Sequence, residues 1–264
     1  MEKRKLGKNR GVWYGKVVSE LKFSHDVKDR KTGEVVESFY TFQVQTEIID
    51  KKGNTIDASI VPVTVPTSKL QEIKPEVSDV NEKIKVGDLV FLKGSWRAYD
   101  YKDSQSSRTR LEQNAYVKII EVHDDFQVRT RNKFEFEGVL VKKLYEFERT
   151  EDGTPVKDEK GRLVPKTDEE GNIKYVVRKN KEGKVVNDFI VAINRPNGSD
   201  YIPCIAYTRL ATKIAKEIPV GAEVEGAGYI RAREYQSGGV TRLAYEAVVT
   251  SLEVKETTEE EGDE

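Results

Sequence analysis

Tyrosine and arginine alternate along residues 228–235 (GYIRAREY) near the end of the chain. Side chains alternate between the two faces of a β-strand, so Ile230 and Ala232 would point into a core and the residues between them would point outward. Exposed rings can stack on nucleic-acid bases, and guanidinium groups can pair with phosphates. The residues predicted to do so are Tyr229, Arg231, Arg233 and Tyr235.

A second alternating stretch, residues 200–207 (DYIPCIAY), carries two more tyrosines. One face would hold Tyr201 and Tyr207, and the other would hold the apolar Ile202, Cys204 and Ala206. We expect both tyrosines to be platforms for bases; the alternative is that they pack under a loop or at a subunit contact. Cys204 would be an inert, buried thiol.

Residues 96–101 (WRAYDY) follow the same alternation. Trp96 would point inward, and Arg97, Tyr99 and Tyr101 would point outward as further nucleic-acid-binding candidates. Trp13 is expected in the core for the same reason. Tyr14, on the opposite face of its strand, is a candidate surface residue.

Three more arginines are candidates for phosphate contacts. They are Arg195, Arg242 and Arg110, and simple solvation at the surface is the alternative for Arg195 and Arg242.

Residues for other kinds of chemistry are scarce. Cys204 is the only cysteine, which excludes disulfides within the chain and a cysteine-based zinc cluster. His25 and His123 are the only histidines, too few for a histidine-rich metal centre. There is no GxxxxGK phosphate loop, no nucleophile elbow and no HExxH pair. We therefore expect no enzyme, no metal and no cofactor.

The chain contains a duplication. Residues 86–101 align without a gap on residues 220–235, and both copies continue through Thr-Arg-Leu to a Glu-Val pair. Equivalent residues include Gly94 and Gly228, Arg97 and Arg231, Trp13 and Phe136, and Pro62 and Pro203. We predict a first domain over residues 1–125, with a basic N-terminal segment, and a second over residues 132–254.

The elements of each copy indicate a mainly β fold. Alternating strands surround one expected helix per copy, over residues 208–218 and, less regularly, residues 69–81, which include Pro75. Three strands, a helix and a two-stranded hairpin are the order of an OB-fold, so the prediction is two tandem five-stranded OB-fold barrels. Residues 148–184 would form an extended hairpin or mobile loop inserted after the first strand of the second barrel.

Charge and hydropathy limit the location. No stretch is apolar and long enough to span a membrane, and no signal peptide is evident, so a cytoplasmic protein is expected. Residues 255–264 (KETTEEEGDE) form an acidic tail, expected to be disordered, and residues 1–254 are mildly basic without it.

Four segments, NDFIVAINR, DYIPCIAYTRLA, GAEVEGAGYIRAREY and TRLAYEAVV, make the chain resemble the bacterial single-stranded-DNA-binding proteins. The resemblance implies single-stranded DNA wrapped over the barrel face, stacking on Tyr201 and Tyr207, and a homodimer that assembles four OB-folds. It would place the protein in DNA replication, recombination or repair, with proteins of those processes as partners. Family tails usually end in apolar residues that dock partners, whereas this one ends GDE.

The two barrels are not expected to be equal. Ile60 and Pro66 stand in the first copy where the second has Tyr201 and Tyr207. We expect the second barrel to bind more tightly, with the first binding weakly or serving assembly. The alternatives are a primosomal or recombination accessory module that uses one barrel for protein contacts, and an RNA-binding protein.

Overall fold

The structure is a computed structural model that describes residues 5–50, 52–102, 109–124, 131–237 and 239–255, without the side chains of residues 100–102, 109–110 and 237. Over these residues the chain is mainly β, with twelve strands, two α-helices and one 3-10 turn. The first half holds β1 (Lys8–Val17), β2 (Lys22–Lys28), β3 (Val35–Ile49), β4 (Thr55–Pro66), β5 (Leu89–Lys102) and β6 (Thr109–His123). The second half holds β7 (Arg131–Lys143), β8 (Arg178–Lys179), β9 (Val185–Arg195), β10 (Gly198–Tyr207), β11 (Glu223–Ser237) and β12 (Val240–Val254).

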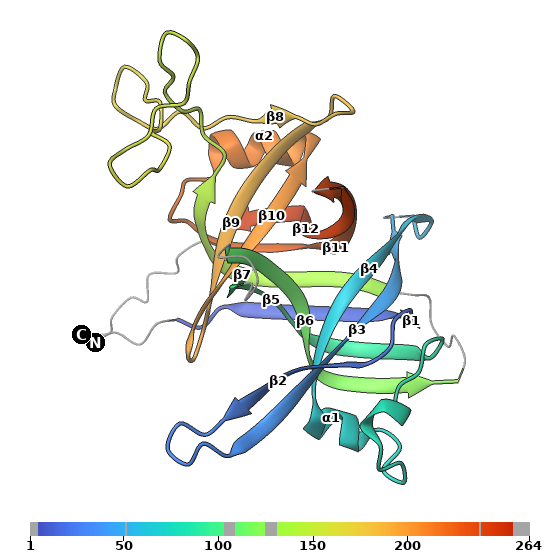
Figure 1. Ribbon diagram of the computed structural model, residues 1–264. Helices are drawn as coiled ribbons and strands as arrows, with labels where there is room; N and C mark the ends of the chain where they lie inside the picture. Colours follow the sequence, from blue (N-terminus) through green and yellow to red (C-terminus); the bar gives the residue numbers. More distant parts are fainter. Residues whose placement is uncertain (1–4, 51, 103–108, 125–130, 238, 256–264) are drawn as a thin grey trace, which may run out of the picture.

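Strand pairing closes a ring of five strands in each half (Figure 1). In the first ring, the pairs run β1–β3–β4–β6–β5 and back to β1. In the second ring, they run β7–β9–β10–β12–β11 and back to β7. The pairs β4–β6 and β10–β12 are parallel, and the other pairs of the two rings are antiparallel. The two halves thus have the same topology, as the duplication predicts.

The inward side chains of the alternating strands fill each ring. Trp13 and Trp96 are fully buried with ring centroids 6.3 Å apart, which confirms their prediction as core residues. The prediction for Tyr14 is wrong, because this residue is 2% exposed. Phe91 and His123 lie edge-on against its ring and cover that face of β1.

The helices differ between the halves. Helix α2 (Thr208–Glu217) confirms the predicted second helix and packs Ala211 and Ile214 against the core. The helix expected over residues 69–81 is instead a shorter α1 (Thr67–Glu72) and a 3-10 turn, η1 (Val80–Glu82). Pro75 accounts for the break, since proline has no N–H to donate and restricts the residue before it.

A buried lysine binds main-chain oxygens at the end of each helix. Lys83 Nζ donates to the carbonyl oxygens of Ile73 and Lys74 at 2.9 and 3.2 Å. Lys143 Nζ donates to those of Ala215 and Ile218 at 3.0 and 2.7 Å, and burial lowers the pKa of Lys143. These bonds satisfy carbonyl groups that a helix end leaves unpaired.

Strands β1 and β7 join the rings through an antiparallel ladder centred on Gly11 and Phe134, which face each other. The alignment of Trp13 with Phe136 makes Gly11 and Phe134 equivalent positions of the two copies. The ladder is therefore symmetric about this pair, and the rings are related by an approximate two-fold axis.

Two asparagines repeat this symmetry at the ladder. Asn9 bonds both main-chain polar groups of Trp96, donating from Nδ2 at 2.7 Å and accepting at Oδ1 at 2.8 Å. Asn132 does the same with Ile230, at 2.7 and 2.9 Å. Asn9 and Trp96 occupy the same places in the first copy as Asn132 and Ile230 in the second. The duplication therefore preserves side-chain bonding as well as strand order.

The inserted segment 148–184 is not a single extended hairpin. Isolated bridges define three short hairpins, closed by the pairs Arg149 with Pro155, Lys157 with Leu163 and Thr167 with Ile173. Three backbone hydrogen bonds of 2.9–3.1 Å link Glu148, Val156 and Val164 in a cycle, and three of 2.8–2.9 Å link Glu146, Lys166 and Lys174 in another. The hairpins radiate from these two junctions at the upper left of Figure 1.

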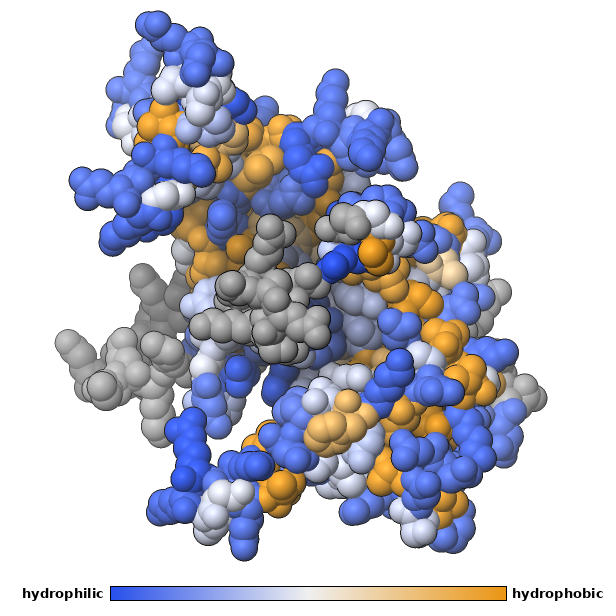
Figure 2. Space-filling view, in the orientation of Figure 1, coloured by the Kyte–Doolittle hydropathy of each residue, from blue (hydrophilic) through white to orange (hydrophobic). Residues whose placement is uncertain are grey.

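Hydrophilic side chains cover the tips of the inserted hairpins and of the β2–β3 hairpin in Figure 2. Among the described residues, none of the helices has the length and apolar character of a membrane span.

Candidate nucleic-acid interface

The outer face of the second ring carries exposed tyrosines from two strands. Tyr201 on β10 is 57% exposed and Tyr235 on β11 is 38% exposed. Ile202 and Ile230, which alternate with such residues, are fully buried. Strand parity therefore gives the correct orientation at these positions. The aromatic side chains of both tyrosines are available for stacking.

The two arginines of β11 share a carboxylate. Arg231 donates to Glu246 Oε2 at 2.7 Å, and Arg233 donates to Glu246 Oε1 at 3.0 Å. Arg231 also donates to the Tyr207 hydroxyl. Burial opposes the charge of Arg231, but the bonds to Glu246 and Tyr207 outweigh it and raise its pKa. The guanidinium groups are thus held in place but partly neutralised, which the sequence did not indicate.

A small apolar cluster lies on this outer face, outside the main core. It consists of Val186, Ile205 and Val248, and Tyr207 and Tyr229 pack against it. Burial raises the pKa of Tyr229, so its phenol stays neutral well above physiological pH. These two tyrosines are half-buried, so they offer less ring surface than Tyr201.

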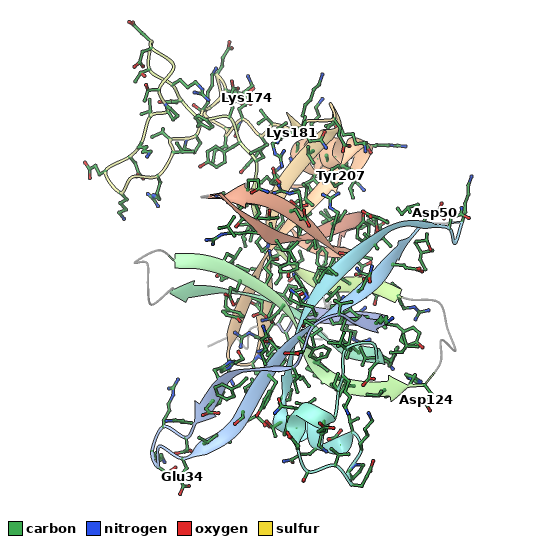
Figure 3. The ribbon with its side chains drawn as sticks, turned by 45° about the vertical axis from the view of Figure 1, so that its right-hand side comes forward. Glu34, Asp50, Asp124, Lys174, Lys181 and Tyr207 are labelled. Atoms are coloured by element: carbon green, nitrogen blue, oxygen red, sulfur yellow. The ribbon has the colours of Figure 1, made fainter. Side chains whose placement is uncertain are left out.

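A basic segment, residues 178–184, borders this face. It and the outer strands line a groove of about 1070 Å³ that contains Tyr207, Tyr229, Arg231 and Arg233. Lys181 and Tyr207 are labelled in Figure 3, where the lysine lies above the tyrosine. Within the described part of the chain, Lys179 and Lys181 have no ion-pair partner, whereas Arg178 is bound to Asp188.

Sequence reasoning missed these lysines as candidates. The composition of segment 178–184 is that of an ordinary solvent-exposed turn. Only the fold brings this segment beside the tyrosines.

The outer face of the first ring has a stack of a different kind. The Arg97 guanidinium lies 3.8 Å from the centroid of the Tyr116 ring. Tyr116 contacts Phe39 at 5.5 Å, and Phe39 stacks on His25 at 4.9 Å with an interplanar angle of 13°. Sequence reasoning missed Tyr116, Phe39 and His25, because they come from three separate strands that only pairing brings together.

The other candidates of the first ring divide into two groups. Tyr99 is 42% exposed, and its hydroxyl accepts a hydrogen bond from Asn114 Nδ2 at 3.1 Å. Tyr101 and Arg110 face each other on β5 and β6, but their side chains lie outside the described residues.

The remaining arginines of the second ring lie at its two ends. Arg195 pairs with the buried Asp200 at 3.1 Å, beside the β9–β10 turn. Arg242 is half-buried and lies opposite Tyr235 in the β11–β12 register. Arg242 therefore lies opposite an exposed tyrosine, whereas Arg195 lies near the first five-stranded ring.

The reactive groups of the described residues offer no metal centre. No group of three or more His, Cys, Asp or Glu side chains within them could hold a metal ion. Cys204 is 4% exposed, and burial raises the pKa of its thiol. A thiol in this environment is a poor nucleophile at neutral pH.

Comparison with known protein families and with curated protein sequences gives no match. The fold does have counterparts among solved structures. The wild-type single-stranded DNA binding protein from Thermus aquaticus matches with a TM-score of 0.61 and 13% identity, over 95% of this chain and 94% of that one. A deletion mutant of the same protein matches with a TM-score of 0.62 and 13% identity, over 95% of each chain. The chain therefore shares the fold of that protein along nearly its whole length.

Proposed function

We propose that this protein binds single-stranded DNA without sequence specificity, by stacking bases on tyrosines and pairing phosphates with arginine and lysine. The observation that carries the proposal is the outer face of the second ring. Two exposed tyrosines, Tyr201 and Tyr235, lie there beside a groove lined by tyrosine, arginine and lysine. The shared fold with a protein named for single-stranded DNA binding supports the same conclusion.

Stacking and phosphate pairing together supply enough binding free energy for a protein that binds single strands of any sequence. Stacking contributes about 1–3 kcal/mol per base and tolerates any base, because each base has a π-face. Each phosphate contact adds a salt-sensitive component, since log K falls by about 0.7 per contact against log salt for single strands. A few platforms and a few cations would therefore bind tightly at low salt without reading the sequence.

The finer architecture belongs to this proposal. Each five-stranded ring would be an OB-fold barrel, the domains would span residues 1–125 and 132–254, and the chain would belong with the bacterial single-stranded-DNA-binding proteins. Two features support this assignment: each ring is closed, and a helix follows the third of its five strands, after β4 in the first ring and after β10 in the second. A homodimer would then present four barrels.

The biological role proposed is protection of single strands in replication, recombination or repair, with no catalytic step. The second ring would be the tighter of the two sites, because Tyr201 and Tyr207 have no counterpart at Ile60 and Pro66. Partner proteins of those processes are part of the same proposal.

A titration with three labelled ligands tests the function. Fluorescence anisotropy would compare oligo-dT, RNA of the same length and duplex DNA at several salt concentrations. Tight, salt-sensitive binding of oligo-dT with much weaker binding of duplex is expected. Preference for RNA would favour an RNA-binding protein, and binding that is micromolar or weaker for all three would favour a protein-docking module. A mass measurement in solution tests the dimer.

A further inference from the structure

One hairpin of each five-stranded ring, β3–β4 in the first and β9–β10 in the second, extends beside the other ring. The tip of the β9–β10 hairpin extends down beside β5 in Figure 1, and β10 contacts β5. The β3–β4 hairpin, whose tip carries the labelled Asp50 in Figure 3, extends beside the second ring, where β4 contacts β11. The two-fold relation thus creates two seams between the rings. The two seams are formed by equivalent strands that carry different side chains.

The seam under the β9–β10 hairpin holds a basic pocket of about 290 Å³. Arg97, Lys118 and Arg195 line it. Asp200, the one acid among the described lining residues, is 5% exposed and already paired with Arg195. The pocket therefore carries an excess of positive charge.

Two of these cations have unused bonding capacity. Arg97 Nε is buried and has no hydrogen-bond partner among the described residues. Lys118 is exposed and, within the same set of residues, forms no ion pair. It is the extra residue of a β-bulge, because Ile119 pairs with Lys93 and Val117 pairs with Gly94. A bulge redirects a side chain that simple alternation would place elsewhere.

The lining favours a phosphate over a base. None of the described lining residues is aromatic, so the pocket has no surface for stacking. Aromatic residues adjoin two of its lining residues instead. Arg97 rests on Tyr116 of the first ring, and the exposed Tyr201 follows Asp200 on the second.

The opposite seam carries less positive charge. The strand registers place Ile48 where the basic seam has Arg195, and Thr250 where it has Lys118. Ile48 is 2% exposed, and the Thr250 hydroxyl donates to the Ala227 carbonyl at 3.1 Å. Burial raises the pKa of Tyr229, the nearby Arg231 opposes this rise, and Asp57 is close enough to add to it. Arg231, the equivalent of Arg97, is also present there, but its guanidinium is already bound to Glu246 and to the Tyr207 hydroxyl. A phosphate would therefore find three cations at the basic seam and one, already paired, at the other.

We infer that the basic seam is a phosphodiester site, where a single strand crosses from the outer face of the first ring to that of the second. This inference rests on the proposed function and adds the route: the strand passes Arg97, Lys118 and Arg195 and avoids the β3–β4 seam. Tyr116 and Tyr201 would hold the flanking bases.

Lys118→Gln tests the crossing, because among the residues that the structure describes this side chain has no ion-pair partner whose loss would disturb the fold. The salt dependence of binding would be measured with a dT oligomer of about 40 nucleotides, which spans both rings, and with one of about 8 nucleotides, within the range of about 4–16 for one OB-fold. Lys216→Gln, at an exposed lysine of α2, is the matched control. For the long oligomer, Lys118→Gln should lower the slope of log K against log salt by about 0.7, and the control should leave it unchanged.

The outcomes separate the two proposals. The short oligomer should bind the second ring and show no change in slope with Lys118→Gln. An unchanged slope with the long oligomer, while the wild-type protein binds it, would overturn the seam site alone. Equal reductions with both lengths would assign Lys118 to a single ring and overturn the crossing. Failure of the wild-type protein to bind either oligomer would overturn the proposed function, and the seam site with it.

Discussion

The same arginine has opposite surroundings in the two rings. Arg231 of the second ring faces Glu246 across the β11–β12 register and is partly neutralised by it, since Glu246 also binds Arg233. Arg97, its equivalent in the first ring, faces Asn114 and lies on the Tyr116 ring instead. Duplication thus preserves the position of a cation while its neighbours decide whether the charge is available.

The platforms differ in a complementary way. The second ring presents separate, exposed tyrosines, whereas the first ring presents a continuous stack from His25 through Phe39 to Tyr116. Val186 and Val248 of the second ring occupy the positions of Phe39 and Tyr116. The outer face of the first ring therefore carries aromatic residues of its own, although it has no counterparts to Tyr201 and Tyr207.

The largest expected effect comes from removing the exposed tyrosines of the second ring. Tyr201→Ala with Tyr235→Ala should weaken oligo-dT binding by about 2–6 kcal/mol, because each base loses about 1–3 kcal/mol of stacking. The matched pair Tyr99→Ala with Tyr101→Ala should cost less, since the main stack of the first ring uses other residues. Dissociation constants from anisotropy measure both, and equal losses would refute the claim of unequal rings.

The next effect concerns the stack of the first ring. Tyr116→Val introduces the residue type that the second ring has at this position, so the strand keeps a side chain that favours β structure. It removes the platform beneath Arg97 and should weaken binding of a long dT oligomer by about 1–3 kcal/mol. Thermal unfolding of the variant serves as the control for folding. Wild-type affinity in a folded variant would show that bases do not use this stack.

The smallest effects come from exchanging the neighbours of the two arginines. Glu246→Asn frees Arg231 and Arg233, so the slope of log K against log salt should steepen by about 0.7 for each phosphate that these arginines then bind. Asn114→Glu should make Arg97 resemble Arg231 and reduce the slope by about 0.7. Salt titrations of both variants measure the change. Shifts in the same direction would contradict the idea that these two residues control the availability of the arginines.

Alternation alone predicted the orientation of many strand residues. It correctly gave the buried Trp96 in the first ring, and the buried Ile230 and the exposed Tyr201 and Tyr235 in the second, because these residues lie on regular strands. The helix ending before Pro219 was also predictable, since periodicity and a terminal proline coincide there.

Other features depend on contacts that a single strand does not contain. Glu246 reaches Arg231 only through the β11–β12 register, and Lys118 is redirected by a bulge that alternation cannot represent. Tyr14 is buried because the aromatic side chains of Phe91 and His123 cover its face of the sheet. The two junctions from which the three inserted hairpins extend rest on hydrogen bonds between main-chain groups, which carry no residue-specific signal.

Photo-cross-linking tests most directly whether unpaired nucleotides lie on these outer faces. A dT oligomer carrying 5-iododeoxyuridine would be irradiated with the full-length protein, and the modified residues would be identified by mass spectrometry. The account predicts cross-links at Tyr201 and Tyr235 in the second ring and at Tyr99 or Tyr116 in the first. Cross-links confined to α2 and the inserted hairpins would contradict it.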